Sequence, residues 1–423
     1  MTQLQSRDLQ VWLLFFYGFG NACTYSLART VADGTYLSRI GTGRLPELYL
    51  LSAGVVALAA LLHAGAVRKT GLRSTIVCTL VGLSLTSVFL ASLMMKAPNS
   101  LAVLTAGYFL AQIRGTLGTI QFATVLNEQF DSRGLKQVIG FIGFGATIAG
   151  FSMGAMVGVL SDYMSLESFL FIAAVLDLLT ILPFVILRKC FKRHGIDYTA
   201  PPEPDLTQRK SFNWSPSADR AEAYHIRAIV SIVTLSIIAV TLVEYQWKVA
   251  AADWWGTDSV GMTKYFGFFY GSLYLVTGLL QLTLTERLMG GRKILVAVCA
   301  LPSVLFLGAA GAISAATQLW FLAALTFCKF SDSLRRSLHD HAIQLAYRPL
   351  RKPVRRDAIS FISGVVKPVA EATAGVAVVL LSPWFSASGF LTVILAICVV
   401  WLVAIRTLWG QLKEPPKERN TNY

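Results

Sequence analysis

Residues 68–73 read RKTGLR and residues 287–292 read RLMGGR, so the chain repeats a short basic stretch built around glycine. A shift of 219 residues superposes both flanking arginines and a glycine of the two stretches. A shift of 220 residues superposes residues 139–142 (IGFI) on residues 359–362 (ISFI). Because the offset is nearly constant over a long distance, the sequence predicts two related halves rather than a short-period repeat.

The sequence on either side of the basic stretches is apolar. Hydrophobic residues make up 55% of the chain and charged residues only 14%, against about 25% in a typical soluble domain. A helix needs about 20 apolar residues to cross a hydrocarbon core of about 30 Å. We therefore predict an all-α membrane protein with twelve transmembrane helices, at residues 11–31, 45–66, 74–95, 101–126, 138–160, 168–187, 226–250, 265–285, 294–313, 318–334, 358–381 and 386–405.

The only long polar segment separates the sixth span from the seventh and contains Pro201, Pro202 and Pro204. Such a composition is typical of an extended linker. We predict four parts: an N-terminal six-helix bundle at 1–190, a cytoplasmic linker at 191–225, a C-terminal six-helix bundle at 226–408 and a cytoplasmic tail at 409–423.

The basic residues define an orientation. Most of the 37 Lys and Arg residues fall in the loops and tails on one side of these spans, whereas only Arg39, Arg44, Lys96 and Lys264 fall on the other side. Because Lys-rich and Arg-rich loops stay in the cytoplasm, we expect both termini to be cytoplasmic. This asymmetry also accounts for the net charge of +14 without nucleic acid as a partner.

Charged residues also occur inside the predicted spans. An ionised side chain at the centre of a transmembrane helix costs about 2.5 to 3.5 kcal/mol, so such residues face a cavity or a partner. We expect five cations to bind an anionic substrate: Arg29, Arg114, Lys248, Lys329 and Lys367. We expect four acids to couple protons or to form charge pairs: Asp177, Glu244, Glu371 and, near the cytoplasmic end, Glu128.

Local pairing is the alternative for most of these cations, because residues three or four apart on a helix are neighbours. The local pairs are Arg29 with Asp33, Lys248 with Glu244, Lys329 with Asp332, and Lys367 with Glu371. Arg114 has no acid at that spacing, so it needs a substrate anion or an acid such as Asp177 on another helix. Both interpretations of Arg114 stay open at this point.

Motifs for other functions are absent from the sequence. The chain has no GxxxxGK[ST] loop to hold nucleotide phosphates for hydrolysis, and no cysteine or histidine spacing typical of a metal site. We therefore expect neither an enzyme nor a cofactor, and transport energy would come from a gradient or from exchange.

Two parallel six-helix repeats are typical of the major facilitator architecture. The chain also carries five distinctive stretches: ARTVAD (28–33), LPELYL (45–50), LNEQF (126–130), DSLRRSL (332–338) and YRPL (347–350). With these stretches the chain resembles the ATP/ADP carrier family within that superfamily, most closely its free-living bacterial relatives. The resemblance implies nucleotide exchange or proton-coupled nucleotide import across a bacterial inner membrane. It also implies that Arg29, Glu128, Glu244 and Lys367 stand near the positions of charged residues that contribute to transport in that family.

We predict a monomeric, alternating-access secondary transporter for a small anionic metabolite, with ATP and ADP among the candidates and the lipid bilayer as its surroundings. One alternative is an exporter of an amphipathic metabolite, drug or siderophore, which would depend little on Arg114. Another is a membrane sensor or scaffold that transports nothing, which would require neither the repeat nor cavity-facing charges.

Overall fold

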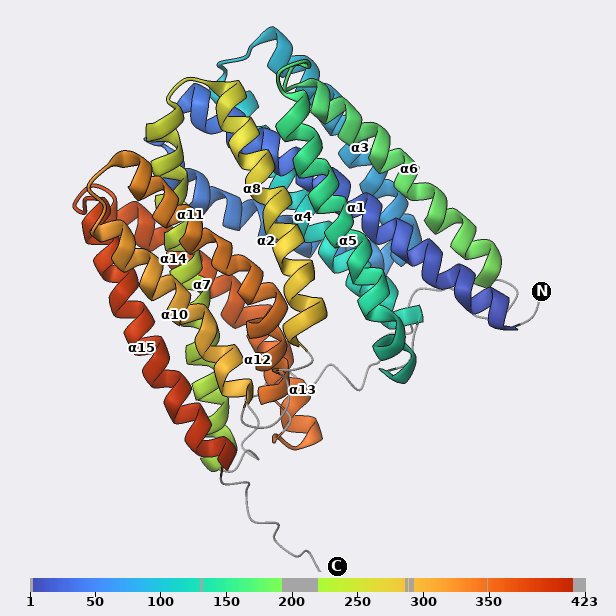
Figure 1. The fold of residues 1–423 in the computed structure, drawn as a ribbon. Coiled ribbons are helices and arrows are strands. Elements are labelled where there is room, and N and C mark those ends of the chain that lie inside the picture. Colours follow the sequence, from blue (N-terminus) through green and yellow to red (C-terminus); the bar gives the residue numbers. More distant parts are fainter. Residues whose placement is uncertain are drawn as a thin grey trace, which may run out of the picture. The chain divides into compact units, whose positions relative to one another are not determined.

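In the computed structural model, the chain is described at residues 3–129, 132–191, 220–285, 288, 293–347 and 349–413, and it is helical almost throughout these ranges (Figure 1). In the first half of the sequence the helices are α1 (Gln3–Ile40), α2 (Leu45–Thr70), α3 (Leu72–Lys96), α4 (Leu101–Gln129), α5 (Ser132–Leu160) and α6 (Ser168–Phe191). In the second half they are α7 (Arg220–Trp255), α8 (Ser259–Leu280), η3 (Gln281–Thr285), α10 (Lys293–Ile313), α11 (Gln318–Leu334), η4 (Arg335–His339), α12 (Asp340–Ala346), α13 (Lys352–Phe361), η5 (Ile362–Val366), α14 (Lys367–Leu381) and α15 (Ala387–Lys413).

Eight helical segments among the described residues are long and apolar enough to cross a membrane. They are α2, α3, most of α5 and α6, α7, α8 with η3, α10 and most of α15. The other predicted spans fall on α1, α4, α11 and α14, where the chain carries Arg29, Arg114, Lys329 and Lys367. The all-helical class is thus confirmed for the described residues, eight candidate spans support the prediction of a membrane protein, and the count of twelve remains a prediction.

Apolar side chains cover the outer face of α2. Leu58 and Leu61 are 57% and 70% exposed, and Leu51 and Leu62 are similarly bare. In water such a stripe would be a large unfavourable apolar surface, whereas a hydrocarbon environment solvates it without cost. The exposed face of α2 therefore fits lipid contact.

Two long helices continue through five-residue π-helical turns. One runs without a break from α11 through η4 into α12, so the backbone passes well beyond Leu334, where the predicted tenth span ended. The other runs from α13 through η5 into α14, and Pro368 is the second residue after η5. Proline has no N–H to donate and its ring clashes with the carbonyl four residues earlier, so a wider turn before it relieves the clash.

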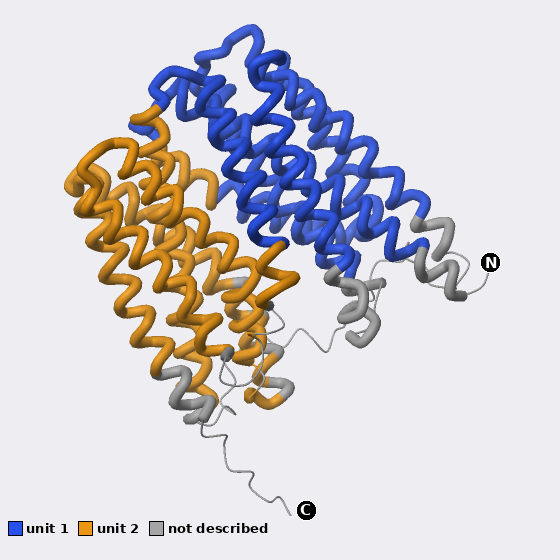
Figure 2. Tube along the Cα trace, in the orientation of Figure 1, with its two compact units in different colours: residues 1–44, 54–206, 255–278 blue, residues 45–53, 207–254, 279–423 orange. Residues whose placement is uncertain are grey.

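The described residues form two compact units (Figure 2). Unit 1 comprises residues 1–44, 54–206 and 255–278, and unit 2 comprises residues 45–53, 207–254 and 279–423. In unit 1, α1 packs against α4, α5 and α6, and its core includes Leu14 and Tyr17 of α1 with Ile142 of α5. In unit 2, α10 packs against α11 and α15. The predicted division at 1–190 and 226–408 remains a prediction, and residues 192–219 and 414–423 of the predicted linker and tail lie outside the described residues.

The RKTGLR stretch makes the sharp reversal between α2 and α3. Gly71 alone links the two helices, with φ +80° and ψ +156°, a conformation that is essentially restricted to glycine. Its N–H donates to the carbonyl of Val67, and its own carbonyl accepts from the hydroxyl of Thr75 at 2.9 Å. The backbone conformation at this reversal therefore requires glycine at position 71. Its counterpart Gly290 lies outside the described residues.

Candidate functional site

Of the four predicted local pairs, three form and one does not. Lys248 lies 3.1 Å from Glu244, Lys329 lies 2.7 Å from Asp332, and Arg29 makes a longer contact of 3.7 Å with Asp33. No ion pair joins Lys367 to Glu371 in the part of the chain that the structure describes. The pair that stays apart is the one that faces a cavity, as described below.

Arg114 and Asp177 form a buried ion pair in unit 1. Arg114 of α4 donates from one terminal nitrogen to the Asp177 carboxylate of α6 and to the Ser87 hydroxyl of α3, each at 2.7 Å. Both side chains are about as buried as the apolar core, at 2% and 1% exposure. The guanidinium also reaches the carbonyl of Thr24 on α1. Of the two interpretations left open by the sequence, the structure shows the one in which Asp177 is the partner of Arg114.

Arg29 belongs to an aromatic cluster in the same unit. Its guanidinium donates to the Tyr25 hydroxyl at 2.8 Å and lies 4.6 Å above the ring of Tyr270 on α8. The Tyr270 hydroxyl in turn donates to Asp33 at 2.6 Å. Arg29 is thus held by a cation–π contact and by a carboxylate that another helix also binds.

Unit 2 contains a chain of alternating charges that joins α7 to α11. Glu244 accepts from Lys248 with one oxygen and from Lys329, at 2.9 Å, with the other. Asp332 then binds Lys329 and lies 3.4 Å from Arg335 on η4. Lys248 and Lys329 are almost fully buried, so each depends on its carboxylates for compensation of its desolvation. The last member of this charge chain, Arg335, is 31% exposed.

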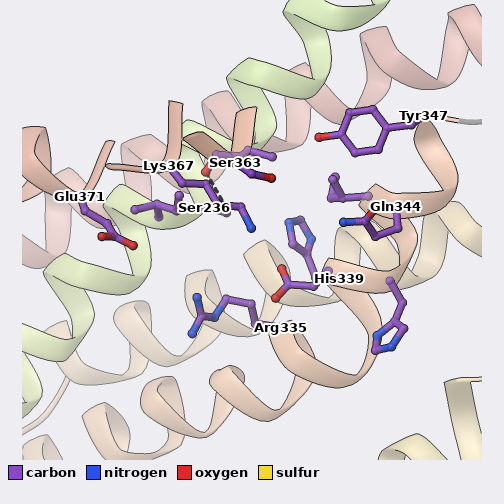
Figure 3. A pocket seen from close by; sticks show the side chains of 13 residues that line it. Ser236, Arg335, His339, Gln344, Tyr347, Ser363, Lys367 and Glu371 are labelled. Atoms are coloured by element: carbon purple, nitrogen blue, oxygen red, sulfur yellow. Dashed lines mark hydrogen bonds between the residues drawn. The ribbon is translucent and has the colours of Figure 1, made fainter. Parts of the chain in front are cut away.

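Arg335 faces a cavity of about 380 Å³ inside unit 2 (Figure 3). The close-up shows Arg335, Lys367, Glu371 and His339 around one space. Both π-helical turns contribute: Arg335 and His339 begin and end η4, and Lys367 directly follows η5. A π-helical turn breaks the regular α-helical register, and such turns are frequent at functional sites. The other lining residues are Val233, Ser236, Ile237, Asp340, His341, Ile343, Gln344, Tyr347 and Ser363.

Sequence reasoning found Lys367 and Glu371 of this cavity but missed Arg335 and His339. Arg335 was counted among the cytoplasmic loop cations because the apolar run ends at residue 334. The helix continues because the π-helical turn keeps the backbone bonded: the Asp340 N–H donates to the carbonyl of Arg335. The stretch DSLRRSL, which includes Arg335, was the available signal. The side chain of Glu128 lies outside the described residues.

The cavity has chemistry suited to a small polar solute. Its volume lies at the lower end of the range of about 300 to 1,000 Å³ found for small-molecule sites. Arg335 offers a planar donor fork that matches carboxylate and phosphate oxygens, and Lys367 offers a point charge. Among the described residues, no group of three or more His, Cys, Asp or Glu side chains is arranged to hold a metal ion.

Comparison with known proteins identifies the fold. No protein-family model matches the chain, and no curated protein matches it in sequence. Among solved structures, a peptide transporter POT in complex with sulfate aligns with a TM-score of 0.68 at 13% identity, over 96% of this chain and 94% of that one.

Two further transporters align over similar lengths. The nucleoside transporter NupG aligns with a TM-score of 0.62 at 13% identity, over 96% of this chain and 99% of that one. A bacterial homologue of the iron transporter ferroportin, in an inward-facing state, aligns with a TM-score of 0.63 at 13% identity, over 98% and 100%. The chain therefore shares its fold with these three proteins.

Proposed function

We propose that this protein is a secondary active transporter for a small metabolite with an anionic group. The observation that carries the proposal is the placement of Arg335 and Lys367 at one cavity from two helices interrupted by π-helical turns. Interrupted helices next to a binding cavity are typical of transporters, because such helices can change shape without losing their backbone bonds. Lys248 and Lys329 have a supporting place in this proposal, because they lie in the charge chain behind Arg335, where Glu244 and Asp332 balance their charges.

The unit 1 cations have a different place in this proposal. Arg114 stabilises unit 1 through its ion pair with Asp177. Arg29, which lies over the ring of Tyr270, contributes to the positive electrostatic potential of unit 1. Glu371 is the proposed proton-coupling group, because its carboxylate faces the cavity and forms no ion pair within the described ranges. Glu244 is assigned to charge pairing, because it binds both Lys248 and Lys329. Nucleotides remain the first substrates to test, since the resemblance to ATP/ADP carriers points to them, in exchange or with protons.

The proposal includes twelve spans, cytoplasmic termini, a bacterial inner membrane and a monomeric state. The loop charges support the orientation. The cavity argues against a scaffold, whose interior would have no reason to hold solvent-accessible charges. In the exporter alternative, transport runs out of the cell. The exported ligand would then bind mainly to the apolar residues Val233, Ile237 and Ile343 and depend less on the cations.

The test is uptake of labelled ATP and ADP into proteoliposomes, with and without trapped nucleotide and with an imposed proton gradient. Stimulation by trapped nucleotide indicates exchange, and stimulation by the gradient alone indicates proton-coupled import. We expect Lys367→Gln to reduce uptake at least tenfold, because a charge-assisted hydrogen bond contributes about 1.5 to 3 kcal/mol. No uptake of either nucleotide moves the search to other phosphorylated and carboxylated anions and to efflux.

The matched control is Lys264→Gln, because Lys264 binds Asp162 at an exposed position of unit 1 and is not among the residues that line the cavity. Uptake of any anion that is unaffected by both Lys367→Gln and Arg335→Gln would refute the assignment of the cavity. Folding of each variant is checked by its thermal unfolding midpoint, since Arg335 also contacts Asp332.

A further inference from the structure

The unit 2 cavity has charges of both signs. Arg335 and Lys367 supply two positive charges, while Asp340 and Glu371 supply two negative charges at the same walls. A site built for a simple anion gains nothing from carboxylates, because a like charge nearby disfavours binding. The acids of this cavity therefore need a role other than binding the anionic group, and the two candidates are proton coupling and binding of a positively charged group.

Glu371 is the informative acid. It stands one helical turn after Lys367, at a rise of about 6 Å along α14, which is the spacing at which Glu244 and Lys248 do pair. No hydrogen bond or ion pair of Glu371 or Lys367 joins them to each other or to another residue in the described ranges, and both side chains are exposed to the cavity. Asp340 is less informative than Glu371, because it interacts electrostatically with its neighbour His339.

The rest of the lining suits the middle of a short dipolar molecule. Val233, Ile237 and Ile343 form an apolar wall, and Gln344 and Ser363 offer neutral donors and acceptors. Figure 3 places Glu371 to one side of Arg335 and Lys367, with His339 beyond them. Acid-binding groups, an apolar wall and an ammonium-binding group thus share one small space.

We propose that the transported solute carries an ammonium group as well as an acid group. The acid group binds Arg335 and Lys367, and the ammonium group binds Glu371. This inference rests on the proposed function, which requires only the anionic group, and it narrows the substrate class to small amino acids and related amino-acid-like metabolites.

The experiment compares three five-carbon probes: 5-aminopentanoate, glutarate and 1,5-diaminopentane. They have a similar length and differ in carrying one charge of each sign, two negative charges or two positive charges at pH 7. Binding to the full-length protein in nanodiscs is measured by the shift of its thermal unfolding midpoint across a concentration series, because a ligand that binds only the folded state stabilises it. We expect the apparent Kd of 5-aminopentanoate to be at least tenfold lower than those of the other two.

Glu371→Gln separates this inference from proton coupling. If Glu371 binds an ammonium group, Glu371→Gln weakens 5-aminopentanoate at least tenfold and leaves glutarate unchanged or tighter. If Glu371 instead takes up a proton with a pure anion, the neutral Gln mimics the protonated acid and binding survives. The matched control is Glu47→Gln, at an exposed position in the first turn of α2.

Glutarate binding as tightly as 5-aminopentanoate would overturn the inference, and so would retained 5-aminopentanoate binding in Glu371→Gln. Absence of binding by all three probes would also overturn it. A different result refutes the proposed function: no anion is taken up in a way that depends on Lys367. Glutarate binding that Lys367→Gln abolishes would preserve the proposed function and refute only the ammonium site.

Discussion

At the residue scale, burial changes what the intramembrane charges do. Arg114 and Asp177 are both shielded from solvent, and a terminal nitrogen of Arg114 donates to the Asp177 carboxylate at 2.7 Å. Removing one partner of such a pair leaves a bare buried charge, which is far more costly than loss of the pair as a whole. We therefore expect Arg114 to stabilise the fold through Asp177.

We predict that Asp177→Asn destabilises the folded protein by about 3 to 5 kcal/mol, because it leaves the Arg114 guanidinium without its counter-charge. The measurement is the thermal unfolding midpoint in detergent, together with the yield of folded protein. The matched control is Asp162→Asn, which removes an exposed ion pair with Lys264 and is expected to cost at most about 1 kcal/mol. Equal midpoints for the two variants would contradict the structural role.

Gly71 gives a second prediction at this scale. Its φ of +80° and ψ of +156° lie in a region that is strained for any residue with a Cβ, so Gly71→Ala is expected to cost about 1 to 3 kcal/mol. The control is Gly65→Ala in the interior of α2, where a Cβ meets nothing within 4 Å and helix propensity favours alanine. A Gly71→Ala variant as stable as Gly65→Ala would show that the reversal between α2 and α3 tolerates a Cβ.

At the scale of elements, the π-helical turns place the cavity residues. One residue of extra backbone rotates everything after it by about 100° around the helix axis, so η4 and η5 decide which side chains of α12 and α14 face the cavity. At η5 the local cause of the π-helical turn is Pro368, which lies at the start of α14.

We predict that Pro368→Ala restores a competing regular helix and turns Lys367 away from the cavity. Uptake of the transported anion should fall at least tenfold, while the unfolding midpoint stays the same or rises, because alanine favours a helix interior over proline by about 3 kcal/mol. The comparison is Pro183→Ala in α6, a helix of unit 1 with a proline in its interior. Full transport activity in Pro368→Ala would show that transport does not depend on the π-helical turn.

The contact of α5 with α8 inside unit 1 depends on glycine. A Cβ added at Gly154 would lie 2.6 Å from the carbonyl oxygen of Gly267 and 2.5 Å from the amide nitrogen of Gly271, so backbone would have to move. We predict that Gly154→Ala costs about 1 to 3 kcal/mol in unfolding free energy, as expected for overpacking. Gly143→Ala on the same helix, where the added Cβ meets nothing within 4 Å, should be neutral. Equal unfolding midpoints would refute close packing at Gly154.

At the scale of the whole molecule, the loop charges predict one topology. Eight spans follow from hydropathy alone, and the remaining four lie on the charged helices α1, α4, α11 and α14. A membrane-spanning helix can hold ionised side chains when each has a partner or a cavity, which the charge chain and the buried pair provide. The charges that lower hydropathy in these helices are therefore compatible with spanning.

We predict that a membrane-impermeant maleimide added to intact cells labels Lys96→Cys and Ala315→Cys but not Lys69→Cys or Arg351→Cys. Both labelled positions are predicted to lie on the sparsely charged side: Lys96 ends α3, and Ala315 lies in the loop between α10 and α11. The background carries serine in place of the exposed Cys78. Labelling of Ala315→Cys and Arg351→Cys from the same side would show that the helix from α11 to α12 does not cross the membrane.

Features that depend on local geometry could be predicted from the sequence. The lengths of the apolar runs predict helices that suit a bilayer, and the three-to-four residue spacing predicts the contacts of Arg29, Lys248 and Lys329 with acids on their own helices. These predictions are possible because the helix pitch brings such residues within reach of each other. The same spacing did not bring about the predicted pair of Lys367 with Glu371 in the described ranges, because both side chains face the cavity.

Ion pairs between different helices, by contrast, can be seen only in the folded chain. Asp177 reaches Arg114 from α6, and Glu244 bridges to Lys329 across α7 and α11, because helix packing brings together residues far apart in sequence. It also brought Arg335 into a cavity with Lys367, since a π-helical turn continues a helix past the end of its apolar run. Neither packing partners nor a change of helical register leaves a periodic signal in the sequence, so only the folded chain shows where these charges meet.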